Sequence, residues 1–242
     1  ILYVLKNNIL IIIILNITFK FFIIIKMTKK INSKLTKLIR YYNLINHNLI
    51  YDKKSINRFK FADNYLIKKG KNKELQNLKN KISKIKNCDL RRNSTNIVFS
   101  DGNPNSKIMI LGEGPGANED LEGVPFIGRA GQLLDKMLLS INLTRGSVYI
   151  TNVVNYRPPE NRSPTEEEIQ RYLPYLTEHI EIIKPKILIL LGSTALNTII
   201  GKEEVISMAR GKWSKRKIGN CVTNVIASFH PAFLMRQPGQ KA

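Results

Sequence analysis

The sequence predicts an α/β fold built on a parallel sheet between about Cys88 and Ala242. Short apolar runs bounded by glycine and proline alternate there with longer segments of helical periodicity, which is typical of βαβ units. In addition, polar residues follow directly on the apolar runs, at the place where sheets of this kind bind ligands. We therefore expect one α/β domain over residues 88–242.

Four apolar runs are the expected strands, and each leads into a loop or a helix. In chain order they are KIMILGEGPG, SVYITNVVNYRPP, KILILLGSTAL and CVTNVIASFHPAFLMR. Their ends carry Glu113, Asn152, Gly192 and His230. Because ligands bind beyond the carboxyl ends of parallel strands, we expect these four residues to meet in one crevice.

Two helices are expected between the strands. The first covers Gly128 to Leu139, with the sequence GRAGQLLDKMLL. The second is SPTEEEIQRYLPYLTEHIEIIKP, in which Ser163 is the expected N-cap and Pro164 the first helical residue. Glu166 follows that cap by three residues, which is the spacing of a capping box.

The first 87 residues differ in composition from the rest. Residues 1–26 form an apolar low-complexity segment, but polar residues interrupt it before the roughly 20 apolar residues that a spanning helix needs. We expect this segment to be translated sequence upstream of a native start at Met27, and a membrane anchor is the alternative. Residues 27–87 predict a basic, Lys- and Asn-rich extension that is helical or partly disordered. Helical spacing is found in Leu35, Leu38, Ile39 and Tyr42 and again in Leu75, Leu78, Ile82 and Ile85.

The formal net charge of +21 indicates an acidic partner. Nucleic acid is the leading candidate, because neutralised phosphates release counterions and so drive binding. An AT-rich coding sequence would also enrich lysine, so we expect both causes to contribute. The two cysteines, Cys88 and Cys221, exclude a disulfide framework and fit the reducing cytoplasm, where we expect the protein to act.

The loop GEGPGANED, residues 112–120, lets a ligand approach the backbone closely because glycine carries no side chain. It lacks the Gly-Lys-Ser/Thr ending of a phosphate-binding loop and the GxGxxG pattern, which argues against a nucleotide cofactor. Glu113 follows the strand directly, where a carboxylate can position water. A surface position is the simpler alternative for this residue.

Three further residues have the chemistry to bind a flat base. Phe126 can stack on it, although a place in the core is equally expected. Asn152 offers a donor and an acceptor to one edge of a pyrimidine, and a turn-forming role is the alternative. His230 can donate to an oxygen that gains negative charge, or serve as a cap or core residue. In the AFLMR segment that follows, apolar side chains can enter a base stack and Arg236 can hold a phosphate. Together these functions are what removal of a base from its sugar requires.

Three long segments resemble the motifs of the family 4 (type 4, iron–sulfur type) uracil-DNA glycosylases. They are GEGPGANEDLEGVPFIGRAGQLLDKML, YITNVVNYRPPENRSPTEEE and FHPAFLMRQP, and they occur in the family's order. ARGKW and VFSDGNPNSKIMILGEGPG are similar too, so the resemblance extends from about Cys88 to the C-terminus. It implies a three-layer α/β/α fold with a four-stranded, mostly parallel sheet. It also implies excision of uracil from DNA after base flipping.

The resemblance implies a role for each matching residue. Glu113, with the Gly114 backbone close by, would position the hydrolytic water, and His230 would stabilise the uracil anion. Phe126 would stack on the flipped uracil, and Asn152 would hydrogen-bond its polar edge. Supporting or contact roles fall to Glu119 and Asp120 as an acidic pair, Asn161 as a further active-site contact, and Leu234 as the probe of the gap left in the duplex.

The family holds a [4Fe–4S] cluster with four cysteines, and this sequence departs from that ligand set. Cys88 occupies the second ligand position, whereas Ile85, Tyr156 and Tyr172 stand at the first, third and fourth. Cys221 lies elsewhere, so we expect no cluster and no other cofactor. The chain ends at GQKA, ahead of a final helix of the family, and we expect a C-terminal truncation.

The leading hypothesis is therefore a DNA repair hydrolase that acts on the N-glycosidic bond of deoxyuridine, as a monomer with no stable membrane partner. The intact Glu113, Phe126, Asn152 and His230 favour it. A catalytically inactive DNA-binding remnant of the same fold is the alternative, favoured by the missing cysteines and the short C-terminus. A membrane-anchored protein is the third hypothesis and rests only on residues 1–26.

Overall fold

The computed structural model describes residues 58–241, and the side chains of residues 70–240. The expectations for the apolar segment 1–26, for a start at Met27 and for a helix around Leu35 to Tyr42 lie outside the described residues. Within residues 58–241, no helix combines the length and the apolar character needed to cross a membrane.

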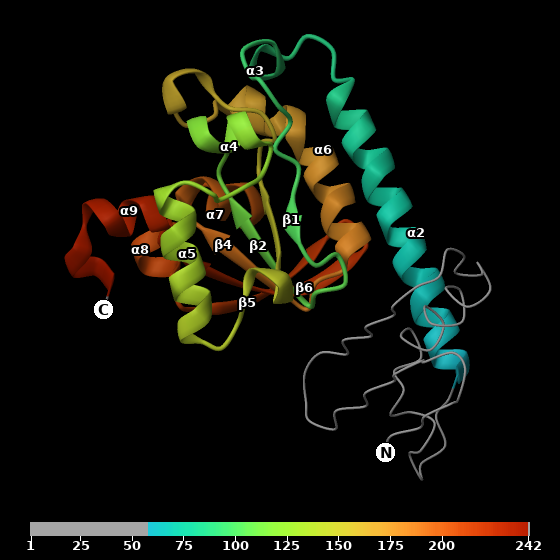
Figure 1. Cartoon of the computed structure of the whole chain (residues 1–242). Helices are drawn as coiled ribbons and strands as arrows, with labels where there is room; N and C mark the ends of the chain where they lie inside the picture. The colour runs from blue at the N-terminus through green and yellow to red at the C-terminus, as the bar shows by residue number, and fades with distance from the viewer. Residues whose placement is uncertain (1–57, 242) are drawn as a thin grey trace, which may run out of the picture. The chain divides into compact units, whose positions relative to one another are not determined.

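Four parallel strands form the centre of the sheet, as the apolar runs predict. They are β2 (Ile108–Gly112), β3 (Tyr149–Asn152), β4 (Ile187–Leu191) and β6 (Cys221–Ser228). The order across the sheet is β1-β3-β2-β4-β6-β5, and each pair among the four central strands is parallel (Figure 1). The predicted α/β class is confirmed.

Two antiparallel edge strands raise the strand number to six, against the four expected. The two-residue strand β1 (Asp101–Gly102) pairs with β3, and β5 (Trp213–Ile218) pairs with β6. Gly219 and Asn220 join β5 to β6, because Ile218 and Cys221 are paired partners in the sheet. Two-residue turns with glycine at positive φ are typical of hairpins, and Gly219 has φ +56°. The glycine of this turn is a feature of the sequence that could have indicated β5, which the sequence analysis did not predict.

Helices α5 (Arg129–Ser140) and α6 (Glu166–Ile183) confirm the two helices expected between the strands, but the predicted start of the second is wrong. Its N-cap is Thr165, not Ser163. The Thr165 hydroxyl accepts from the Glu168 N–H, and the Glu168 carboxylate accepts from the Thr165 N–H at 2.7 Å. This capping box lies two residues later than the expected one and satisfies both backbone donors.

The remaining helices are short, apart from one. The long one is α2 (Arg58–Ser83). After β6 the chain forms α9 (Pro231–Arg236), where the sequence suggested a loop. The others are α3 (Asp89–Arg92), α4 (Ala117–Glu122), α7 (Ser193–Ile199) and α8 (Ile206–Ala209), with 3-10 turns η2 (Arg145–Ser147), η3 (Pro159–Asn161) and η4 (Pro238–Lys241).

Helices cover both faces of the sheet and give three layers (Figure 1). Along β2, Met109 and Leu111 pack with α6, and Ile110 packs with α5 on the opposite face. Alternate side chains of a strand point to opposite faces, so both faces are apolar. The division of the chain near Cys88 stays a prediction.

The apolar side of α2 belongs to the same core as the sheet, and in Figure 1 this helix runs beside α6. The helical spacing predicted for its second half is confirmed, because the residues concerned are all buried: Leu75, Leu78, Ile82 and, just past the end of the helix, Ile85.

Candidate active site

A pocket of about 400 Å³ lies at the carboxyl ends of the parallel strands. Its wall includes most of the residues that the sequence indicated, namely Glu113, Gly114, Glu119, Phe126, Asn152, Asn161, His230 and Arg236. Gly192 stands behind this wall, where a Cβ atom would press on the Cβ of His230. The crevice expected from the strand ends is therefore present.

Phe126 and Asn152 form the inner wall of the pocket and are only 5% and 3% exposed. Gly112, the last residue of β2, allows both to come close, because a Cβ there would collide with Asn152 Oδ1 and with the Phe126 ring. Asn152 Oδ1 is buried and accepts no hydrogen bond from residues 70–240. A buried acceptor without a donor is costly, so this oxygen is suited to a ligand that brings an N–H group.

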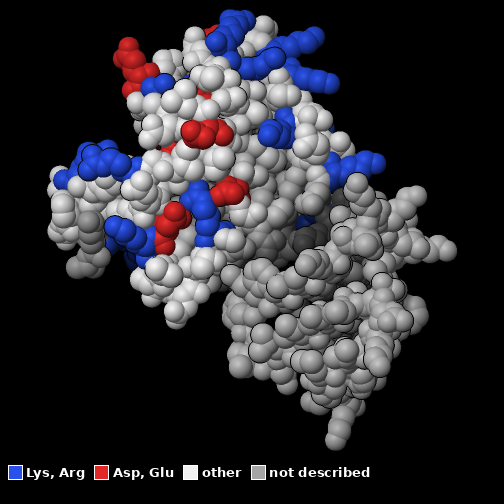
Figure 2. All heavy atoms as spheres, viewed as in Figure 1, with Lys and Arg blue, Asp and Glu red and all other residues white. Residues whose placement is uncertain are grey.

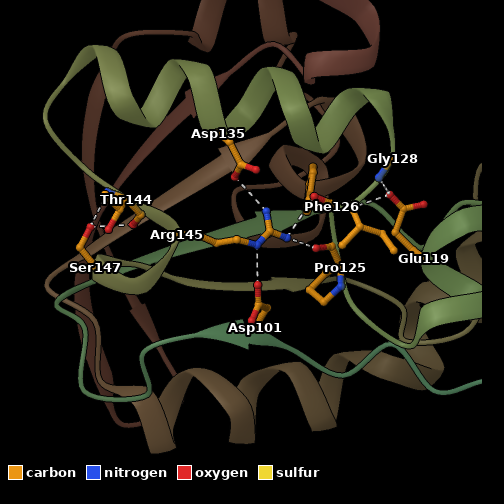
Figure 3. Close-up of polar contacts among 10 residues, drawn as sticks. Asp101, Glu119, Pro125, Phe126, Gly128, Asp135, Thr144, Arg145 and Ser147 are labelled. Carbon is orange, nitrogen blue, oxygen red and sulfur yellow. Dashed lines mark hydrogen bonds and ion pairs between the residues drawn. The ribbon is translucent and has the colours of Figure 1, made fainter.

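The backbone of Phe126 is strained, with φ +55° in the left-handed region. For a residue other than glycine this costs about 1–3 kcal/mol and persists only where its surroundings enforce it. Two groups hold the turn. The Glu119 carboxylate accepts from the N–H groups of Ile127 and Gly128, at 3.2 and 2.9 Å. The Arg145 guanidinium donates to the carbonyl oxygens of Pro125 and Phe126 (Figure 3).

Glu113 follows β2 directly, and its carboxylate is fixed by α7. The Thr194 hydroxyl donates a hydrogen bond of 2.5 Å to Glu113 Oε2. The sequence analysis did not identify Thr194, although a hydroxyl residue at the start of a helix that follows a strand was a usable signal. Held in this way, a carboxylate can orient a water molecule.

His230 is the N-cap of α9, and its ring is oriented by the backbone. Its Nδ1 accepts a hydrogen bond of 3.2 Å from the Ala232 N–H, so the proton of the neutral ring is on Nε2. Burial lowers the pKa of His230, and the nearby Glu113 carboxylate only partly opposes this. The Phe126 and His230 ring centroids are 5.6 Å apart. The pocket therefore contains a neutral imidazole with one N–H donor beside an aromatic ring.

Exposed polar residues border the pocket on the side of η3. Asn161 has a positive φ of 57°, and its Oδ1 accepts from Arg157 Nε at 2.8 Å. Arg162 also lines the pocket but forms an ion pair with Glu168 at 2.7 Å. Arg236 is exposed at the end of α9 and lines the pocket as well.

Two residues to which the resemblance assigned roles are not brought into the pocket. The Asp120 carboxylate is buried and accepts from the backbone N–H groups of Thr95 and Asn96 instead. Leu234 is 6% exposed and is not part of the pocket wall.

The four residues at the positions of the iron–sulfur ligands lie close together in the domain core, outside the pocket. Ile85, Cys88, Tyr156 and Tyr172 are all buried in one apolar cluster, and Cys88 Sγ lies 3.4 Å from the Tyr172 hydroxyl. Burial, followed by the contact with Cys88, raises the pKa of Tyr172, so its phenol stays protonated. A [4Fe–4S] cluster needs four thiolates, and these side chains offer one. The residues present do not fit the cluster, and no group of three or more His, Cys, Asp or Glu side chains suited to a metal occurs in the described part of the chain.

Comparison with known proteins shows the family of the chain. The model of the uracil DNA glycosylase superfamily matches residues 99–242. The chain is 40% identical to the type-4 uracil-DNA glycosylase of Archaeoglobus fulgidus over 174 residues, which cover 68% of this chain and 84% of the relative. The type-4 uracil-DNA glycosylase of Thermotoga maritima is 42% identical over 64% of this chain and 80% of its own length. The type-4 enzyme of Pyrobaculum aerophilum is 40% identical over 68% and 86%. The chain therefore belongs to the uracil DNA glycosylase superfamily and, within it, to the type-4 family.

Proposed function

We propose that this protein hydrolyses the N-glycosidic bond of deoxyuridine in DNA and releases uracil. The observation that carries the proposal is the buried Asn152 Oδ1, which has no donor among residues 70–240 and faces a pocket bordered by Phe126. Uracil presents an N–H between two carbonyl oxygens. The Asn152 amide is the complement of one half of that edge, because its oxygen accepts and its NH₂ group donates.

Recognition begins with a base that has left the duplex. The pocket lies in the wall of a folded domain, so the target nucleotide must rotate out of the stack, which costs a few kcal/mol. Stacking on Phe126 offsets part of this cost, at about 1–3 kcal/mol per base. Gly112 has no Cβ atom, so the ring and the amide can both pack closely against the end of β2 and form the wall of the pocket.

Bond cleavage divides between Glu113 and His230. The C1′–N1 bond breaks with its electron pair going to uracil, which leaves a cationic sugar and an anionic base. The Glu113 carboxylate, oriented by Thr194, holds the water whose oxygen bonds to C1′ and accepts its proton. The Nε2–H group of His230 donates to the uracil oxygen that gains charge, which is the type of preorganised donor that lowers such a barrier.

Contacts with the DNA backbone fall to cations near the pocket. Arg236 is exposed at the pocket border and can hold a phosphate. Figure 2 shows further basic side chains gathered around α3, where Arg91 and Arg92 of the helix and Lys84 and Lys86 of the segment before it are exposed. Leu234 would have to leave its buried position to probe the duplex, so a gap-filling role for it requires a movement of α9.

The proposal includes catalysis without an iron–sulfur cluster. Tyr172 and Tyr156 fill the space beside Cys88 with buried aromatic rings, which supports a structural replacement of the cluster. We also propose that the protein is a monomer of the cytoplasm. Cys88 and Cys221, both buried free thiols, are consistent with a reducing compartment.

The inactive DNA-binding remnant is the competing reading. The ordered contacts of Glu113 with Thr194 and of His230 with Ala232 favour an active enzyme, because binding alone requires neither. The test is incubation of the protein with an oligonucleotide that contains one uracil, followed by alkali, which cleaves the chain at an abasic site. Cleavage at uracil that is lost in His230→Ala supports the enzyme. A folded protein that binds the oligonucleotide without cleaving it supports the remnant.

A further inference from the structure

We propose that Arg145 is a positioning residue, which fixes the ring of Phe126 in the pocket and thereby sets the rate of base release. The inference rests on the proposed function of the pocket. Arg145 belongs to η2, ahead of β3, and its side chain is not part of the pocket wall. Its link to the pocket is the turn of Pro125 and Phe126.

The guanidinium of Arg145 connects three separate segments of the chain (Figure 3). Nε donates to Asp101 of β1 at 2.5 Å, and Nη1 donates to Asp135 of α5 at 2.9 Å. Nη2 donates to the carbonyl oxygens of Pro125 and Phe126, the latter at 3.0 Å. Each of the three nitrogens of the planar group therefore donates hydrogen bonds to a different segment of the chain.

This arrangement acts on the strained residue of the pocket. Phe126 has φ +55°. Without contacts that hold this conformation, its backbone would rotate toward negative φ and the ring would move out of its position in the pocket. The two aspartates hold the guanidinium in place, and the guanidinium holds the carbonyl oxygens of the turn. Gly131 leaves room for this conformation, because a Cβ there would collide with the Phe126 carbonyl.

An arginine suits the position better than another cation. Its rigid fork can serve several acceptors at fixed angles, whereas a lysine offers one point charge on a flexible stem. The side chain is 23% exposed, so the contacts are partly shielded from water and are only moderately weakened by salt. The stacking surface for the base therefore depends on a charge network outside the pocket.

The experiment is a double-mutant cycle in the full chain, with uracil release measured under single-turnover conditions and DNA binding measured separately. We expect Arg145→Met to lower the rate of release about 10- to 100-fold, as a displacement of about 1 Å does elsewhere, with affinity for DNA changed less than about threefold. In a Phe126→Ala background the same substitution should have almost no further effect, because the ring it positions is gone. Lys136→Met, which removes an exposed charge from α5, is the matched control and should leave the rate unchanged.

A milder variant covers the case in which Arg145→Met does not fold. Asp135→Asn removes one of the two anchors of the guanidinium, and we expect a rate loss of about 3- to 10-fold that also disappears in the Phe126→Ala background. Equal losses with and without the Phe126 ring would overturn the inference, as would rates of Arg145→Met that match those of Lys136→Met. Inactivity of the wild-type chain would overturn the proposed function and this assignment with it.

Discussion

The hydroxyl of Thr194 donates a 2.5 Å hydrogen bond to the carboxylate of Glu113, so the first turn of α7 fixes the acidic residue that follows β2. The two residues are 81 positions apart in the sequence. Parallel strands bring them together, because β2 and β4 are neighbours and both end at the pocket. The carboxylate thus keeps one oxygen engaged and one available for water.

Replacement of Thr194 by valine should lower the rate of uracil release about 10- to 100-fold. Valine keeps the shape but removes the donor, so the carboxylate loses its orientation. The variant then loses part of the roughly 10²- to 10⁴-fold contribution of a positioned proton acceptor. Thr194→Ser restores the hydroxyl and should recover most of the rate. Single-turnover assays on both variants provide the measurement, and an equal loss in Thr194→Ser would show that packing, not the hydrogen bond, matters.

Gly112→Ala should displace the two side chains that form the inner wall of the base pocket. The added methyl group collides with Asn152 Oδ1 and the Phe126 ring, so we expect a loss of at least about 100-fold in uracil release and about 1–3 kcal/mol in the free energy of unfolding. Gly70→Ala is the control, because nothing lies within 4 Å of a Cβ at that position in α2. That variant should keep full activity and gain up to about 1 kcal/mol of stability. Normal activity of Gly112→Ala would place the base elsewhere.

The stability of the domain should fall as the pH drops from about 6.5, because of His179. This residue is stacked on Phe99 with 4.6 Å between ring centroids, and its Nε2 lies 2.7 Å from the Tyr149 hydroxyl. Burial lowers the pKa of His179 to about 3. Below the ordinary histidine pKa near 6.5, His179 is protonated in the unfolded chain but stays neutral in the native state. The free energy of unfolding therefore decreases by up to about 1.4 kcal/mol for each unit that the pH falls.

Urea unfolding at pH 6.5, 6.0 and about 5 measures that slope, before most carboxylates titrate. His179→Gln should remove the contribution, at a lower absolute stability. His230 also has a lowered pKa and adds a slope of the same sign, which remains in the variant. An unchanged slope in His179→Gln would contradict the account of this buried histidine.

Tyr172→Phe should destabilise the protein by about 1 kcal/mol and leave uracil release unchanged. The substitution removes only the hydroxyl that lies 3.4 Å from Cys88 Sγ, and one buried hydrogen bond contributes about this much. Tyr175→Phe, on the same helix and less buried, is the matched control for chemical denaturation. A selective loss of activity in Tyr172→Phe would mean that the residue at this iron–sulfur ligand position affects catalysis in the pocket.

The sequence predicted the central strands and the pocket because both follow from local patterns. Apolar runs of four to eight residues mark buried strands, and the ends of parallel strands meet at one edge. Edge strand β5 was missed because its sequence, WSKRKI, is rich in lysine and arginine and contains no apolar run. The start of α6 was misplaced because both Ser163 and Thr165 have a glutamate three residues further on, so the sequence offers two capping boxes, and the structure forms the one between Thr165 and Glu168.

Side-chain direction was harder to predict than position. Glu119 and Asp120 are neighbours on α4, but successive residues of a helix point about 100° apart, so Glu119 reaches the Phe126 turn and Asp120 reaches Thr95. The position of Thr194 at the start of a helix was a local signal, but the contacts of Arg145 and Thr194 join segments that are distant in the sequence, and no local pattern shows which partner each one meets. The roles of the pocket residues, and that of Leu234 outside the pocket wall, stay predictions, which assays of the variants test.

The most direct test of the account is the release of free uracil, in a single turnover, by the full chain purified and assayed with an iron chelator. The result we predict is one uracil released per deoxyuridine, at the same rate with and without chelator, from protein that contains no iron. Glu113→Gln should lose this release while it still binds the oligonucleotide. Release that requires bound iron, or a folded, DNA-bound protein that releases nothing, would contradict the claim that this pocket excises uracil without a cluster.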